Sequence, residues 1–159
     1  HWDHTLGYLL GFKKYSKLVS LNLFYGIEYL SLKKSNTEKF WRSYSNAYYA
    51  YGRYDYFTYQ GRRMGAHSGS SSDDLIFMLG LSDDNSTTLM SYNKERHGIK
   101  SMPYPELKTE YVLTYHRNIT SHHTAFITLE YEHIKNFGFI QNNVSVSKLI
   151  WFGYSFSIN

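Results

Sequence analysis

The sequence predicts an all-β fold: an antiparallel transmembrane (outer-membrane) β-barrel, with this chain supplying the C-terminal strands of a larger barrel. Three observations predict it. Seven segments alternate apolar and polar residues with a period of two, which is the pattern of a strand with two different faces. The connections between these segments alternate between short and long. Aromatic residues make up 19% of the chain and include 17 tyrosines, and such rings suit the two interfaces of a membrane.

Length and composition limit the classes of protein to which this chain can belong. The 159 residues allow one domain, residues 1–159. The absence of cysteine excludes disulfides and thiolate metal sites. No run of about 20 apolar residues is present, which excludes a transmembrane helix, whereas a membrane strand needs only every second residue to be apolar. The net charge of +4 comes from scattered basic residues without a recognition motif, so we expect no nucleic-acid partner.

Seven strands are expected, each with one apolar and one polar face. In chain order they cover residues 5–12, 17–33, 74–81, 86–95, 107–116, 124–134 and 150–158. The second is the clearest: one face carries Val19, Leu21, Leu23, Tyr25, Ile27 and Tyr29. Several polar faces carry Glu and Lys together, which suits a charged lumen.

The predicted connections alternate strictly in length. Short ones cover residues 13–16, 82–85 and 117–123, and longer ones cover 34–73, 96–105 and 135–143. Outer-membrane barrels have short periplasmic turns and long extracellular loops, so residues 34–73 are expected to form a long extracellular loop. Seven strands is an odd number and below the usual minimum for such barrels. We therefore expect the remaining N-terminal strands of the same barrel to lie outside this sequence.

The long loop is rich in aromatic residues and arginine. Residues 37–50 predict a short helix, capped by Asn36 or Thr37. An aromatic run at residues 56–59 is followed by Gly61-Arg62-Arg63-Met64-Gly65, by Gly69, and by residues 73–75, which lead into a strand.

This stretch resembles the Wzi-like family of capsule-assembly outer-membrane proteins. In that family an aromatic run precedes Gly-x-Pro-Leu-Gly-His and a Gly/Asp-rich stretch leads into a strand. Here Arg63 replaces the proline, and Ala66 stands where histidine is expected, with His67 one position later. The resemblance implies a larger barrel in the bacterial outer membrane. It also implies a non-enzymatic role without a cofactor, in which the protein retains capsular or similar surface polysaccharide.

The residues of the loop are compatible with sugar binding. Aromatic rings stack on the apolar faces of sugars, and polar side chains bind the hydroxyl edges. Arginine also clamps acidic sugars through bidentate contacts. The alternative is that the tyrosines pack on each other and plug the barrel mouth. The candidate carbohydrate-binding residues are Trp41, Tyr49, Arg53, Tyr54, Tyr56, Tyr59, Arg62, Arg63, His67, His97 and Tyr104.

Metal binding and catalysis are weaker interpretations. His1, Asp3 and His4 are suitable zinc ligands but lack a further partner at a known spacing. His122 and His123 are adjacent and would face opposite sides of a strand. No nucleophile motif surrounds any serine, so no catalytic residue and no enzyme activity are expected.

Two other functions remain open alongside polysaccharide binding. The first is another outer-membrane channel or uptake protein, which would have a water-filled lumen. The second is a soluble barrel of lipocalin type, which would hold an apolar ligand inside. The expected partners under the main interpretation are surface polysaccharide and outer-membrane lipid.

Overall fold

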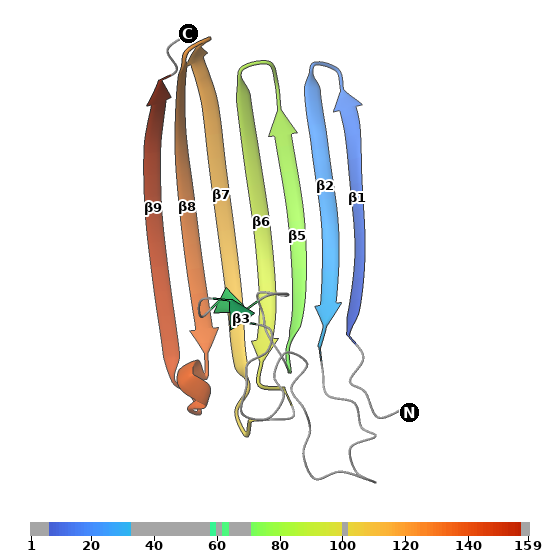
Figure 1. Cartoon of the computed structure of the whole chain (residues 1–159), viewed down its shortest axis with the longest axis vertical. Coiled ribbons are helices and arrows are strands. Elements are labelled where there is room, and N and C mark those ends of the chain that lie inside the picture. The colour runs from blue at the N-terminus through green and yellow to red at the C-terminus, as the bar shows by residue number, and fades with distance from the viewer. Residues whose placement is uncertain (1–6, 33–57, 60–61, 64–70, 100–101, 157–159) are drawn as a thin grey trace.

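The computed structural model describes residues 7–32, 58–59, 62–63, 71–99 and 102–156. Its main body is a seven-stranded antiparallel sheet in the order β1-β2-β5-β6-β7-β8-β9 (Figure 1). This confirms the all-β prediction; the sheet is not closed into a barrel. The strands are β1 (Tyr8–Leu18), β2 (Leu21–Ser31), β5 (Asp73–Ser82), β6 (Ser86–His97), β7 (Glu106–Thr120), β8 (His123–Lys135) and β9 (Val144–Phe156).

The connections alternate in length as predicted. Short turns at residues 19–20, 83–85 and 121–122 lie at one end of the sheet. The strand ends that flank the longer connections, between β2 and β5, between β6 and β7, and between β8 and β9, all lie at the other end (Figure 1). We call these the turn end and the loop end. The last connection contains a 3-10 turn, η2 (Phe137–Phe139).

The predicted first turn, at residues 13–16, is wrong. Strand β1 continues to Leu18, and the chain reverses at Val19, whose φ is 56°, and Ser20. The polar residues that suggested a turn belong to the sheet. Lys13 lies opposite Gly26 and its ammonium group is 2.6 Å from Glu28 Oε1. In the sequence, a lysine that pairs with a glutamate of the next strand therefore has the same polar character as a residue in a turn.

Strand register sorts the side chains onto two faces, because residues paired across strands point to the same side of a sheet. Adjacent residues of one strand, such as Tyr111 and Val112, lie on opposite faces. The cross-strand rows on one face include Phe12, Ile27, Phe77, Tyr92, Tyr111 and Tyr131, and then Tyr25, Leu79, Met90, Leu113, Leu129 and Ile150. The rows on the other face include Glu28, Ile76, Asn93, Glu110, Glu132 and Ser147, and then Asp74, Glu95 and Lys108.

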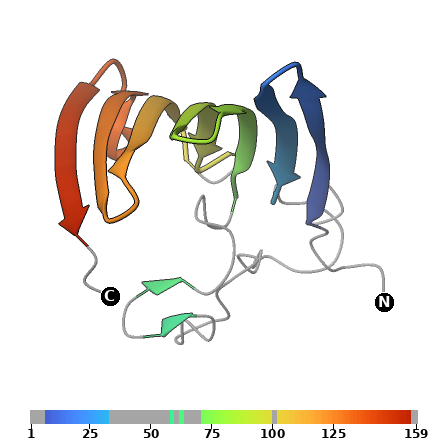
Figure 2. The same cartoon turned by 90° about the horizontal axis from the view of Figure 1, so that it is seen from above.

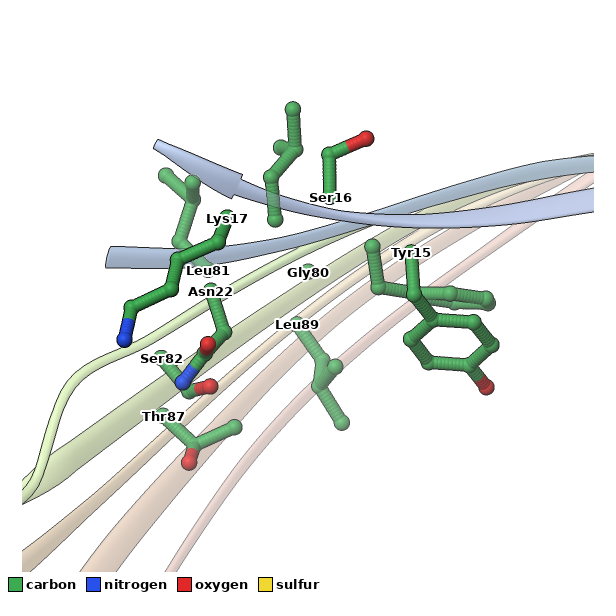
Figure 3. A pocket seen from close by; sticks show the side chains of 11 residues that line it. Tyr15, Ser16, Lys17, Asn22, Gly80, Leu81, Ser82, Thr87 and Leu89 are labelled. Atoms are coloured by element: carbon green, nitrogen blue, oxygen red, sulfur yellow. The ribbon is translucent and has the colours of Figure 1, made fainter. Parts of the chain in front are cut away.

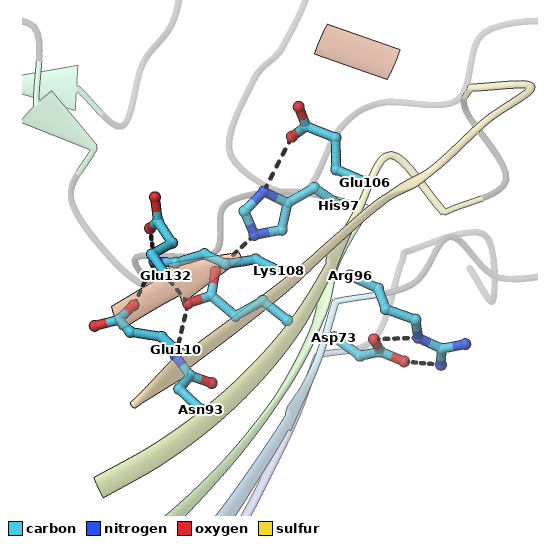
Figure 4. A network of polar contacts seen from close by, with 9 residues as sticks. Asp73, Asn93, Arg96, His97, Glu106, Lys108, Glu110 and Glu132 are labelled. Atoms are coloured by element: carbon cyan, nitrogen blue, oxygen red, sulfur yellow. Dashed lines mark hydrogen bonds and ion pairs between the residues drawn. The ribbon is translucent and has the colours of Figure 1, made fainter. Parts of the chain in front are cut away.

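The sheet is curved like an arch, and its two faces therefore differ (Figure 2). Glu110 and Glu132 lie on the concave face (Figure 4), and the apolar rows therefore lie on the convex face. Convex side chains of the inner strands remain exposed, including Leu129 at 38%, Phe77 at 44% and Met90 at 50%. Among the described residues, Leu32 is the one large hydrophobic residue that is buried. The described strands thus do not bury their own apolar face.

A small hairpin lies on the concave side of the sheet (Figure 2). It consists of β3 (Thr58–Tyr59) and β4 (Arg62–Arg63), with Tyr59 opposite Arg62. The helix predicted at residues 37–50 lies outside the described residues. In the part of the chain that the structure covers, no helix is long and apolar enough to cross a membrane.

A glycine on β9 makes room for a ring on β8. Gly153 lies opposite Phe126, and a Cβ atom added to this glycine would overlap the phenyl ring. The same ring stacks on His116 at a centroid distance of 5.4 Å and meets Trp151 edge-on at 5.3 Å. The cluster on this part of the concave face therefore depends on a residue without a side chain.

We expect Gly153→Val to destabilise the fold by about 1–3 kcal/mol, because the valine displaces the Phe126 ring from its site. Urea denaturation of the refolded protein measures the change. Adding Phe126→Ala to Gly153→Val should recover part of the loss. Equal losses in the single and the double variant would contradict the proposed overlap.

Asp83 organises the turn between β5 and β6. Its Oδ1 atom accepts hydrogen bonds from the backbone N–H groups of Asn85 at 2.8 Å and Ser86 at 2.6 Å. Its Oδ2 atom accepts one from the Ser86 hydroxyl at 2.9 Å. The Asn85 amide above all, and then both Ser86 donors, hold the pKa of Asp83 below its ordinary value of 3.8. The ionised carboxylate is thus the form that the turn stabilises.

Asp83→Ala should therefore lower the denaturation midpoint near neutral pH. The ionised Asp83 carboxylate stabilises the wild type fully above the unfolded-state pKa of 3.8. This stabilisation is lost as the pH falls through the lower pKa of the folded state. Denaturation midpoints measured across this acidic range should converge for the two proteins. A difference that is constant with pH would show that the charge of Asp83 does not stabilise the turn.

Candidate functional site: a charged cluster on the concave face

Four charged residues meet at the loop end of the concave face. Lys108 lies at the centre, with its ammonium nitrogen 2.6 Å from Glu110 Oε2, 3.2 Å from Glu132 Oε2 and 3.6 Å from Glu95 Oε1 (Figure 4). Register explains the arrangement. Lys108 lies opposite Glu95 on β6, and Glu110, two residues further along β7, lies opposite Glu132 on β8. Three strands therefore bring carboxylates to one ammonium group.

His97 and Asn93 extend this cluster around Glu95. His97 Nε2 is 2.7 Å from Glu95 Oε2, and its Nδ1 is 3.7 Å from Glu106 Oε2. The Asn93 amide donates a hydrogen bond to Glu95 Oε1 at 2.6 Å. Glu95 is only 1% exposed. A buried carboxylate is tolerated when it is paired and hydrogen-bonded, and its lysine, histidine and amide neighbours provide this compensation.

The charged cluster, which comprises Glu95, Glu106, Glu110, Glu132, Lys108 and His97, has more acidic than basic groups. Carboxylate oxygens accept hydrogen bonds, so the cluster suits hydroxyl-bearing or cationic groups and repels anions. Among the described residues, no group of three or more His, Cys, Asp or Glu residues has an arrangement that could hold a metal ion.

A second ion pair lies on the opposite, convex side of the sheet (Figure 4). Arg96 Nε donates to Asp73 Oδ1 at 2.7 Å, and a terminal guanidinium nitrogen of Arg96 contacts Asp73 Oδ2. The two residues are paired across β5 and β6. This bidentate geometry is the strong form of an arginine–carboxylate contact, and it fixes the register where the two strands reach the loop end.

The turn end of the concave face contains a hollow (Figure 3). A hollow of about 400 Å³ lies beside Gly80, where a Cβ atom would come within 2.9 Å of Leu89 Cδ2. Apolar side chains form one part of it and polar ones the rest. The lining side chains include Tyr15, Phe24, Leu89, Lys17, Asn22, Ser82 and Thr87. The concave face thus changes from charged at the loop end to mixed at the turn end.

The candidate sugar-binding residues fall into two groups. Six of them lie outside the described residues: Trp41, Tyr49, Arg53, Tyr54, Tyr56 and His67. The structure describes Tyr59, Arg62 and Arg63 as backbone of the β3–β4 hairpin. Tyr104 is 40% exposed on the connection between β6 and β7. His97 lies within the charged cluster, where its ring contacts carboxylates.

The sequence pattern does not indicate the charged cluster as a unit. The pattern predicted Lys108, Glu110 and Glu132 on polar faces but did not indicate that they meet. The available signal was the short turn at residues 121–122, since hairpin turns fix the register of their strands. Counting from that turn alone fails, because the ladder shifts by one position between Asn118 and Thr120. The alternation of both strands together would have shown the need for this shift.

Comparison with known proteins supplies no relative: no protein-family model, no curated protein and no solved structure matches this chain. What the chain does is therefore inferred from the described strands and their side chains.

Proposed function

We propose that this chain forms part of an outer-membrane β-barrel that anchors capsular or similar surface polysaccharide through its loop end. One observation carries the membrane part of the proposal: the curved sheet has an apolar convex face and a charged concave face (Figure 2). Soluble barrels of lipocalin type enclose their apolar face, whereas membrane barrels turn it outward and keep a polar lumen. The described curvature matches the second arrangement.

The convex face also has the layering of a membrane surface. Phe77, Tyr92, Tyr111 and Tyr131 lie side by side across β5 to β8, with successive ring centroids 6.1, 5.1 and 6.3 Å apart. From β5 to β9 the next row towards the turn end is apolar and contains Leu79, Met90, Leu113, Leu129 and Ile150. On β2 and β1 the same row continues with Tyr25 and Lys14. A girdle of amphipathic rings beside an apolar band is typical of a barrel at a membrane interface.

Additional strands of the same polypeptide complete the barrel in this proposal. Within the described sheet, β1 and β9 each pair on one side only. Their free edges expose backbone groups along 11 and 13 residues. Lipid offers these groups no hydrogen-bond partner, and free edges otherwise template aggregation. Further strands that close the barrel supply hydrogen-bond partners for the backbone groups of both edges.

The polysaccharide part of the proposal depends on the loop end. The β3–β4 hairpin brings Tyr59, Arg62 and Arg63 to the concave side of the sheet. Tyrosine stacks on sugar faces, and arginine binds hydroxyls and acid groups. The charged cluster adds carboxylate acceptors for hydroxyl groups. The resemblance of residues 56–75 to the Wzi-like family supports the same function without a catalytic step.

A channel is the second candidate, and the charged concave face favours it. Side chains such as Lys108 and Glu132 suit a lumen that contains water. The two candidate functions differ in what they require of the hairpin. In a polysaccharide anchor, the hairpin and its loop are expected to block the opening of the barrel, whereas in a channel this opening is expected to be free. Single-channel conductance in a planar bilayer therefore separates them.

The first experiment tests the membrane location. Cells that produce the full-length protein are fractionated, and the protein is run on a gel with and without boiling. Recovery in the outer membrane, together with a folded band that shifts on boiling, supports the barrel. Recovery as a soluble monomer without detergent would overturn both membrane functions and leave the internal-ligand interpretation.

The second experiment tests polysaccharide anchoring in cells that make a capsule. The variant carries Tyr59→Ala, Arg62→Ala and Arg63→Ala, and the matched control carries Asp84→Ala in the short turn at the opposite end. We expect the hairpin variant to release polysaccharide into the medium while the control retains it on the cells. Unchanged retention by a correctly inserted variant, together with high conductance of the wild type, would favour the channel.

A further inference from the structure

Basic side chains gather on the convex face in and beyond the row of tyrosines, on the side of the loop end. We call Lys94, His133, Lys135 and Lys148 the basic patch. Lys94 lies on β6, His133 and Lys135 lie on β8, and Lys148 lies on β9. Register brings them together: Lys94 and His133 both lie opposite Thr109 of β7, and Lys148 lies opposite Tyr131.

The lysines of this patch carry uncompensated charge. Lys94, Lys135 and Lys148 are exposed, and no ion pair within the described part of the chain includes any of them. Two concave lysines differ from them, since Lys13 and Lys108 each lie 2.6 Å from a glutamate oxygen. These two ammonium groups are neutralised within the sheet, and those of the patch are not.

The nearby convex carboxylate does not neutralise the patch. Asp73 holds Arg96 through the bidentate pair at the same end of the sheet. The three lysines therefore leave a local excess of positive charge, to which His133 adds when protonated. Between the row of tyrosines and the turn end, the convex strand positions include two lysine or arginine residues, Lys14 of β1 and Arg117 of β7, which lie on separate strands and in separate rows. The positive charge is thus concentrated at the loop end.

The position of the basic patch along the strands, relative to the row of tyrosines, indicates what it contacts. Lys94 follows Tyr92 by two residues on β6, and His133 follows Tyr131 by two residues on β8, so these two cations lie one row beyond the aromatic row. Lys148 lies in the aromatic row, opposite Tyr131, and Lys135 lies two rows beyond it. In the proposed barrel that row marks the boundary between hydrocarbon and headgroups. The patch then lies at the level of the headgroups, in the leaflet that surrounds the loop end.

We infer that the basic patch binds phosphate-bearing lipid headgroups of that leaflet and selects anionic over zwitterionic lipid around the barrel. The inference depends on the proposed membrane location. Each ammonium group forms charge-assisted hydrogen bonds to phosphate oxygens, and Tyr111 and Tyr131 provide hydroxyl groups from the adjacent row. Basic residues at a membrane surface attract anionic lipid by this mechanism.

The test uses the full-length protein in phosphatidylcholine vesicles that contain spin-labelled phosphatidylglycerol or spin-labelled phosphatidylcholine. Electron paramagnetic resonance measures the fraction of each label that is immobilised at the protein surface. The test variant combines Lys94→Gln, Lys135→Gln and Lys148→Gln. The matched single substitutions are Lys135→Gln in the patch and Lys17→Gln on the concave face.

We expect the wild type to prefer phosphatidylglycerol and the triple variant to lose this preference. Removal of one lysine should reduce the preference by up to about fivefold, whereas Lys17→Gln should leave it unchanged. Equal association of the two lipids with the wild type, or an unchanged preference in the triple variant, would overturn the inference. The band shift on boiling is measured in the same samples. Absence of selectivity in the wild type, with the band shift intact, refutes only the lipid site, whereas failure of the wild type to insert refutes the membrane location as well.

Discussion

Met90→Arg should destabilise the inserted protein by about 2–4 kcal/mol, the cost of a basic residue on the lipid face near the middle of a membrane barrel. Met90 lies in the apolar convex row, between Leu79 of β5 and Leu113 of β7. Its side chain is 50% exposed in the described sheet. In water, an arginine at such a half-exposed position changes stability little. The size of the loss in stability therefore shows whether the convex face contacts lipid or water.

The neighbouring residue supplies a control with the same change in charge. Ser91 lies on the concave face, opposite Met78 and Val112, so Ser91→Arg places the new guanidinium group in the proposed lumen. Urea denaturation of the protein refolded into vesicles should give a much smaller loss for this variant. Equal and small losses for the two variants would contradict a lipid-facing convex side. A larger loss for Ser91→Arg would indicate that the concave face is the dry one.

Lys108→Gln should cost up to about 3 kcal/mol, the lower end of the range for breaking a buried ion pair by removing one partner. Lys108 lies within 4 Å of three glutamates, and one of them, Glu95, has a side chain that is only 2% exposed. Without the ammonium group, three carboxylates remain close together. The lower end of the range applies because the Lys108 side chain is 20% exposed and reaches water.

Two further variants separate charge from packing in the cluster. Lys108→Arg keeps the charge and should retain most of the stability. Glu95→Gln combined with Lys108→Gln removes the buried negative charge together with its cation and should recover part of the loss. Denaturation midpoints of the four proteins, measured in the same vesicles, provide the comparison. If Lys108→Arg is as unstable as Lys108→Gln, the packing of the side chain and not its charge is what stabilises the cluster.

The local pattern of residues determined most of the secondary structure. The alternation that separates Tyr111 and Leu113 from Lys108 and Glu110 is a property of one strand, because successive side chains of any strand point to opposite faces. It therefore predicted the seven main strands, the order of short and long connections, and the two faces. The prediction of the first turn was wrong because Lys13 is polar for a reason that lies on β2, where its ammonium group forms an ion pair with Glu28.

Functional prediction from the sequence was less complete. His97 was predicted as a carbohydrate-binding residue, and its described contacts are with Glu95 and Glu106. The other members of the charged cluster were predicted as polar-face residues without a shared site. Separate strands supply them, and the spacing within one strand contains no information about a neighbour.

The tertiary structure decided two matters that no single segment determines. The first is register. Between β7 and β8 the pairing changes from Thr120 opposite His123 to Asn118 opposite Thr124, and Ile119 is the extra residue. Without this bulge Glu110 would lie opposite His133, and the polar face of one strand would continue into the apolar face of the next. The bulge is thus what allows Lys108 to meet Glu132.

The second matter is curvature. The sequence alone specified one apolar and one charged face, and it left open which face is turned outward. Curvature arises from the twist and coiling that accumulate over many paired strands, so it exists only in the assembled sheet. In this protein it places the apolar rows outside and Lys108 with its glutamates inside (Figures 2 and 4). The alternation is a property of each strand, and the direction of the faces is a property of all seven.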